Sequence, residues 1–176
     1  MTISLYDATI PSFLQQLRAL ASLIAKAEEF CAEKSLPESE IQSARLTDDM
    51  LPFSWQVRFG PGHSIKAIEA VRDGTYQPDF SEPPASFAEQ RAMLEDAIAG
   101  LEALDRAEVN GFAGRDVVFS IPSADVRLEF TAEDFLLSFS LPNFYFHVTT
   151  AYALLRARGV AVGKMDFLGA IRMKAA

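Results

Sequence analysis

Two histidines are the residues of this chain best suited to proton transfer or metal binding. His147 lies in an apolar stretch late in the sequence. An unperturbed imidazole titrates near physiological pH, so His147 could serve as a metal ligand or as a general base. Alternatively, it is a buried core histidine whose ring donates a hydrogen bond to a carbonyl or to Asn143, one helical turn earlier.

His63 follows the segment Gly60-Pro61-Gly62, which must interrupt a helix. If that broken helix faces the helix of His147, the two imidazoles approach each other. With a carboxylate such as Asp49 they could form a two-histidine, one-carboxylate metal site. Metal–nitrogen bonds of ~2 Å would then place the ring nitrogens about 3 Å apart. The alternative is a solvated His63, or one that caps a helix.

Other polar side chains share the helix of His147 and could bind a small molecule in a pocket at the centre of a bundle: Asn143, Tyr145, Thr149, Thr150 and Tyr152. Phe135, Phe139 and Phe146 recur at helical spacing and are expected to belong to the core. Cys31 has no neighbouring base and is expected to be a buried, inert thiol. The sequence lacks glycine-rich phosphate loops, Cys-x-x-Cys pairs and Gly-x-Ser-x-Gly or His-Glu-x-x-His motifs.

Four helical segments are expected to position these side chains. Apolar residues at intervals of three and four predict a first helix from about Ile10 to Lys34, capped by Thr9 with Pro11 in its first turn. A short helical turn is expected within 37–44, and a second helix within about 50–73, broken at Pro61 and ended by Gly74. Residues 75–84 read as a loop. Ser86 and Glu89 form a capping box for a third helix that runs to about Arg106.

The hydrophobic period changes to two in the region 116–130, which predicts a β-hairpin with one apolar face on the helices. Thr131 and Asp134 form a second capping box, which begins a long last helix over about 131–158 that Pro142 should bend. The expected fold is therefore mainly α: an up-and-down four-helix bundle with a hairpin between helices three and four, forming one domain over 1–176. A final turn is expected within 164–169.

The composition of the chain argues against two classes of binding partner, nucleic acids and anionic membranes. The chain has 176 residues, a formal net charge of −8 and a single cysteine. No basic stripe is present, which argues against nucleic acid and against an anionic membrane surface. The 21 residues Phe135 to Leu155 carry no charge, but polar groups such as Asn143 and His147 favour a buried helix over a membrane span. Without a signal peptide at the amino end, the expected location is the cytoplasm.

Several segments of the sequence resemble a bacterial and fungal domain family of unknown function: ISLYDA at 3–8, ARLTDDM at 44–50, LPNFYFHVTTAYALLR at 141–156 and GKMDFLG at 163–169. That family is similar to the DinB/YfiT-like superfamily of four-helix bundles. The resemblance implies metalloenzymes that use a divalent metal such as Zn or Ni, some of them thiol-dependent transferases, and it implies a homodimer.

The superfamily's metal site, as the resemblance implies it, has one histidine on the second helix and two at positions i and i+4 on the last helix. His147 takes the final position, but Asn143 stands four residues earlier, and the stretch Gln56 to Phe59 contains no histidine. A three-histidine site is therefore impossible in this chain. We expect the binding residues to be His147, Asn143, His63, Tyr152 and Gln56, with only His147 and His63 available to a metal.

Two functional hypotheses follow from the sequence. The first is a non-catalytic bundle, in the form of a homodimer, that binds a small molecule or a partner protein. The second is a metal-dependent enzyme of the transferase or hydrolase type that uses His147 and His63. The incomplete set of histidines favours the first hypothesis.

Overall fold

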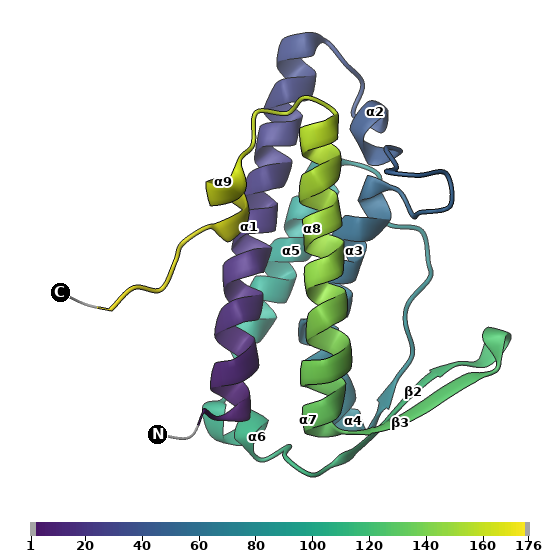
Figure 1. Ribbon diagram of the computed structural model, residues 1–176, viewed down its shortest axis with the longest axis vertical. Coiled ribbons are helices and arrows are strands. Elements are labelled where there is room, and N and C mark those ends of the chain that lie inside the picture. Colours follow the sequence, from purple (N-terminus) through teal and green to yellow (C-terminus); the bar gives the residue numbers. More distant parts are fainter. Residues whose placement is uncertain (1–2, 175–176) are drawn as a thin grey trace.

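The computed structural model describes residues 3–174, and its largest helices form a bundle (Figure 1). The bundle consists of α1 (Leu5–Lys34), α3 (Phe53–Gly62), α5 (Phe87–Glu102) and α8 (Leu141–Ala157). Shorter helical elements connect or cover them: α2 (Ser39–Gln42), α4 (Ile65–Asp73), α6 (Arg106–Asn110), η1 (Pro122–Ala124), α7 (Ala132–Asp134), the π-helix η2 (Phe135–Ser140) and α9 (Lys164–Leu168).

Helix α1 runs the length of the bundle and packs against α5, α8 and α9 (Figure 1). Its apolar stripe is fully buried at Phe13, Leu17 and Leu20. The ring of Phe13 meets that of Phe144 edge-on at 4.9 Å, a geometry that adds about 0.5–1.5 kcal/mol to the burial of the two rings. The expected end of α1 at Lys34 is confirmed. Its start is not, because Ser4, rather than Thr9, accepts the capping hydrogen bond from the Asp7 amide.

The second helical region divides differently from the expectation. Helix α3 continues through Pro61 to Gly62, and the break falls at His63 and Ser64. Helix α4 then ends at Gly74, whose φ of +79° is the left-handed conformation that glycine adopts without strain. The corner between α3 and α4 therefore lies at His63.

Helix α5 begins at the expected capping box, in which the Ser86 side chain and Glu89 cap each other's backbone amides. It ends at Glu102 rather than near Arg106. Asp105 stops the chain from continuing as one helix, because its carboxylate caps the separate helix α6 by accepting from the Glu108 amide at 2.9 Å.

A three-stranded sheet lies at one end of the bundle. Strands β2 (Asp116–Ile121) and β3 (Val126–Thr131) pair antiparallel, in the region where alternating residues predict a hairpin. Val117 and Phe119 are buried, whereas Leu128 is 43% exposed, because the far end of the hairpin projects away from the helices (Figure 1). Strand β1 (Thr75–Tyr76) pairs parallel with β2 in a segment expected to be a loop.

The long last helix expected over 131–158 is three consecutive elements. Thr131 caps α7, the π-helix η2 follows, and α8 begins at Leu141 with Pro142 in its first turn. None of the helices within residues 3–174 combines the length and the apolar character needed to cross a bilayer.

Candidate functional site

Helices α3 and α8 lie side by side and bring His147 against Gln56 and Phe59 (Figure 1). The Nδ1 atom of His147 is 2.8 Å from Oε1 of Gln56. The Gln56 amide nitrogen donates to the Leu51 carbonyl at 2.8 Å, which fixes the orientation of the amide. Gln56 Oε1 therefore accepts a hydrogen bond from Nδ1–H, and Nε2 of His147 carries the lone pair. His147 is thus a buried, hydrogen-bonded histidine, as one of the two interpretations of the sequence expected, but its partner is Gln56 rather than Asn143.

His63 and His147 do come together, within a set of five rings that we name the histidine cluster: Phe59, His63, Tyr76, Phe139 and His147. The two imidazole centroids are 5.6 Å apart and the ring planes differ by only 9°. His63 is 6% exposed, and its Nδ1 atom is buried without a hydrogen-bond partner. The sequence also allowed a solvated His63 or one that caps a helix. The structure shows neither, because the side chain is buried and Ser64 is the N-cap of α4.

Burial sets the charge of both histidines. Burial, and to a smaller extent the nearby His147, lower the pKa of His63 to about 3. Burial likewise lowers the pKa of His147 to about 4. Both imidazoles are therefore neutral at physiological pH, and neither has the near-neutral pKa that suits a general base.

The histidine cluster offers at most two metal ligands of the usual kind in the described part of the chain. The two imidazole planes are nearly parallel, with centroids 5.6 Å apart. Asp49, the carboxylate considered with them, is exposed and hydrogen-bonded to Thr47. Within residues 3–174, no three His, Cys, Asp or Glu side chains group in a way that could hold a metal ion. The side chains that surround the two histidines are aromatic.

The remaining polar residues of α8 do not converge on this cluster. Asn143 donates to the Phe139 carbonyl at 2.7 Å, and Thr150 donates to the Phe146 carbonyl at 2.7 Å. Tyr152 packs against Phe167 of α9, with ring centroids 5.6 Å apart. Of the expected binding residues, the structure thus joins His147, His63 and Gln56, and it leaves Asn143 and Tyr152 outside.

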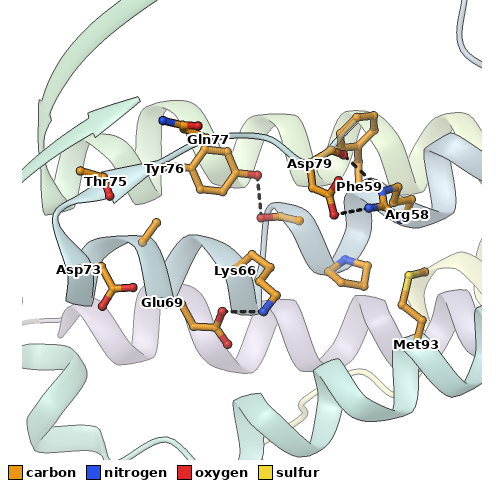
Figure 2. A pocket seen from close by; sticks show the side chains of 13 residues that line it. Arg58, Phe59, Lys66, Glu69, Asp73, Thr75, Tyr76, Gln77, Asp79 and Met93 are labelled. Atoms are coloured by element: carbon orange, nitrogen blue, oxygen red, sulfur yellow. Dashed lines mark hydrogen bonds and ion pairs between the residues drawn. The ribbon is translucent and has the colours of Figure 1, made fainter. Parts of the chain in front are cut away.

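A pocket of about 440 Å³ lies on the other side of Phe59 and Tyr76, between α3, α4 and the segment 75–79 (Figure 2). Its wall combines apolar and charged side chains with the backbone of the α3–α4 corner: Arg58, Phe59, Pro61, Gly62, Lys66, Glu69, Ala70, Asp73, Thr75, Tyr76, Gln77, Asp79 and Met93. The Tyr76 hydroxyl donates to the Gly62 carbonyl at 3.0 Å and closes the pocket floor.

Sequence reasoning did not find this pocket. The sequence predicted a helix break at Gly60-Pro61-Gly62 and a loop over residues 75–84. What was missing is that β1 pairs with β2 and thereby holds the loop beside α4. Burial of the phenol on this pocket floor raises the pKa of Tyr76 to about 12, which keeps its hydroxyl protonated as a donor.

Comparison with known proteins identifies a family model and a solved structure that resemble this chain. The model of the domain of unknown function DUF1993 matches residues 5–168. A crystal structure of a DinB family member protein from Shewanella denitrificans superposes with a TM-score of 0.80 and 31% sequence identity, covering 98% of this chain and 96% of that one. The sequence has no match among curated proteins. The fold is therefore the DinB-like helical fold, and the chain belongs to the DUF1993 family of domains of unknown function.

Proposed function

We propose that this chain is a non-catalytic protein that binds a small molecule in the pocket between α3, α4 and residues 75–79. The observation that carries the proposal is the pocket itself, whose volume of about 440 Å³ suits a small organic ligand. Its backing is rigid, because Phe59 and Tyr76 pack against the buried histidines on their other side. A rigid wall lowers the entropic cost of binding.

The chemistry of the reactive side chains supports a non-catalytic role. The two histidines are neutral, buried and stacked rather than directed at an open space. Cys31 is 4% exposed, and burial raises the pKa of its thiol, so it is a poor nucleophile. A transferase or hydrolase that used His147 and His63 around a metal has less support, because no third His, Cys, Asp or Glu side chain joins them in the described part of the chain.

A variant that fills the pocket tests the proposal. A Cβ atom at Gly62 would meet Phe59 and Tyr76 at 3.6 Å, an ordinary contact, so Gly62→Leu places a side chain in the pocket without backbone strain. The matched control is Ala157→Leu, on the exposed last residue of α8. Binding of three aryl probes, 2-phenylethylammonium, 2-phenylethanol and 3-phenylpropionate, is measured by ligand-observed NMR.

We expect at least one probe to bind the wild-type protein and Ala157→Leu but not Gly62→Leu. Both substituted proteins should retain the wild-type circular dichroism spectrum, which separates a blocked pocket from an unfolded chain. Equal binding by Gly62→Leu and the wild type would place the probes elsewhere on the molecule. That result, or the absence of any binding to the wild type, would overturn the proposal.

A further inference from the structure

The pocket lining contains more negatively charged than positively charged side chains. Three are acidic and two are basic, so the lining has a net charge of −1. Arg58 forms an ion pair with Asp79, and Lys66 Nζ lies 2.7 Å from Glu69 Oε2. Asp73 forms no ion pair with any residue in the described part of the chain, because the adjacent Arg72 is turned to Glu108 at 2.7 Å. The unbalanced charge is therefore that of Asp73.

The pocket has two chemically different ends. Figure 2 shows Asp73 and Thr75 at one end, and Phe59, Met93 and the Arg58–Asp79 ion pair at the other. Glu69 and Asp73 are four residues apart on α4, so their carboxylates lie on the same face of the helix. The end at Asp73 and Thr75 therefore offers an unpaired carboxylate and a hydroxyl group, whereas the charged groups at the other end are already paired.

The net charge of the whole chain also favours a cationic ligand. With a net charge of −8, the chain attracts cations and repels anions at long range. The two cations of the lining do not offset this, since each is already held by a carboxylate. A carboxylate or phosphate ligand would have to displace one of those ion pairs, whereas an ammonium group would neutralise the unpaired acid.

We infer that the ligand of the pocket is a small organic cation, an ammonium group on an apolar or aryl body. The ammonium lies between Asp73 and Thr75, and the body lies along Ala70 and Tyr76, next to that end of the pocket. This inference rests on the proposed function, because it names the ligand class of the same pocket. It also identifies Asp73 as the residue that determines specificity for positive charge.

The three aryl probes test the inference, since they share a phenyl ring and differ mainly in charge. Dissociation constants are measured by calorimetric titration at pH 7 and low salt on the wild type, Asp73→Asn and Asp125→Asn. Asp125 is the control because it lies at the hairpin turn, outside the pocket, with a φ of +52° that asparagine also tolerates.

We expect the ammonium to bind roughly tenfold more tightly than the alcohol, about 1.4 kcal/mol, and the carboxylate to bind most weakly. Asp73→Asn should remove most of that preference, and Asp125→Asn should leave it unchanged. Added salt should reduce the preference.

The outcomes separate the two proposals. If the alcohol or the carboxylate binds as tightly as the ammonium and Gly62→Leu abolishes that binding, the charge assignment is wrong and the pocket remains the ligand site. If Asp73→Asn keeps the full preference for the ammonium, Asp73 is not its partner and the inference fails. If Gly62→Leu does not affect binding of any probe, the proposed function fails as well.

Discussion

At the scale of single residues, the contact between Gln56 and His147 shows how the chain uses its last-helix histidine. Gln56 satisfies the Nδ1 proton of a ring that is 9% exposed, and its own amide nitrogen is satisfied by the Leu51 carbonyl. A buried polar pair of this kind stabilises one packing of two helices over its alternatives, because a shifted register would leave both groups unpaired.

Replacement of Gln56 should therefore be costly. Gln56→Leu leaves the His147 Nδ1 proton buried without an acceptor, and we expect a loss of about 1–3 kcal/mol in the free energy of unfolding. Gln16→Leu is a matched control, since Gln16 is 5% exposed and its Oε1 atom already lacks a partner. Urea denaturation measures both. Equal losses in the two variants would contradict the stabilising role of the Gln56–His147 bond.

Metal addition and removal should leave the protein unchanged. The two histidines have no third His, Cys, Asp or Glu partner among the described residues. A ligand bound tightly to the native state raises the Tm, so dialysis against a chelator and addition of Zn²⁺ or Ni²⁺ should not shift the Tm of this protein. Thermal melts and metal analysis of protein prepared without a histidine tag measure this. Stoichiometric metal that is lost in His147→Ala, with the melt otherwise intact, would refute the non-metal assignment.

At the scale of elements, the two capping boxes were the most predictable features. The Ser86–Glu89 box and the Thr131 cap act through neighbours three residues away, so the sequence alone reveals them. Strand β1 was not predictable, because its two residues pair with Val118 and Phe119, more than forty positions later. The π-helix η2 was missed for another reason: its residues are ordinary helix formers, and only packing distinguishes the two helical forms.

Some features of the candidate site could likewise be predicted from the sequence, and others could not. A histidine on an apolar helical face could be read from the sequence, and so could its approach to His63 if α3 faced α8. The ring orientation could not be predicted, because it depends on Tyr76 and Phe139, which pack against His63 from two other elements. Gln56 was named as a binding residue by its position, but its role as the partner of His147 required the register between α3 and α8.

One element-scale contact holds the outer wall of the pocket. The Arg58 guanidinium is largely buried and donates to Asp79, to Ser81 and to the Glu82 carbonyl. All of these hydrogen bonds from Arg58 go to residues 79–82, so Arg58 holds that segment against α3. Hydrogen bonds from Ser81 and the Arg58 charge lower the pKa of the Asp79 carboxyl, which keeps the contact ionised.

Arg58→Met should release this segment without unfolding the bundle. We expect faster proteolytic cleavage and faster hydrogen exchange within 79–82, with a small change in Tm, because partly exposed ion pairs contribute about 0–1 kcal/mol. Arg18→Met, which removes an exposed pair with Glu102, is the control and should leave exchange in 79–82 unaltered. Unchanged exchange in Arg58→Met would show that the segment is held by other contacts, such as Phe80 on Phe59.

At the scale of the whole molecule, the buried histidines make stability depend on pH. Their folded-state pKa values of about 3 and about 4 lie below the ordinary 6.5, so as pH falls through 6.5 the unfolded chain takes up protons that the folded chain does not. The stability they confer is therefore fully present above pH 6.5 and is lost progressively towards pH 3–4. Carboxyls with lowered pKa values, such as Asp166, act only below about pH 4.

Urea denaturation at pH 7 and pH 5 should therefore differ by on the order of 2 kcal/mol for each histidine. His63→Phe, which keeps an aromatic ring in the cluster, should show roughly half of the pH dependence of the wild type. A free energy of unfolding that stays constant between pH 7 and pH 5 would mean that the imidazoles are not held neutral by burial.

Helix α1 has a consequence for the order in which the molecule is assembled. Its apolar stripe is covered by α5, α8 and α9, and the last two of these begin at Leu141 and Lys164. During synthesis the stripe therefore leaves the ribosome more than a hundred residues before its final cover. Until α8 emerges, the ring of Phe13 lacks its edge-on partner Phe144 and can contact solvent or a chaperone. Folding of this bundle can be completed only when α8 and α9 have emerged.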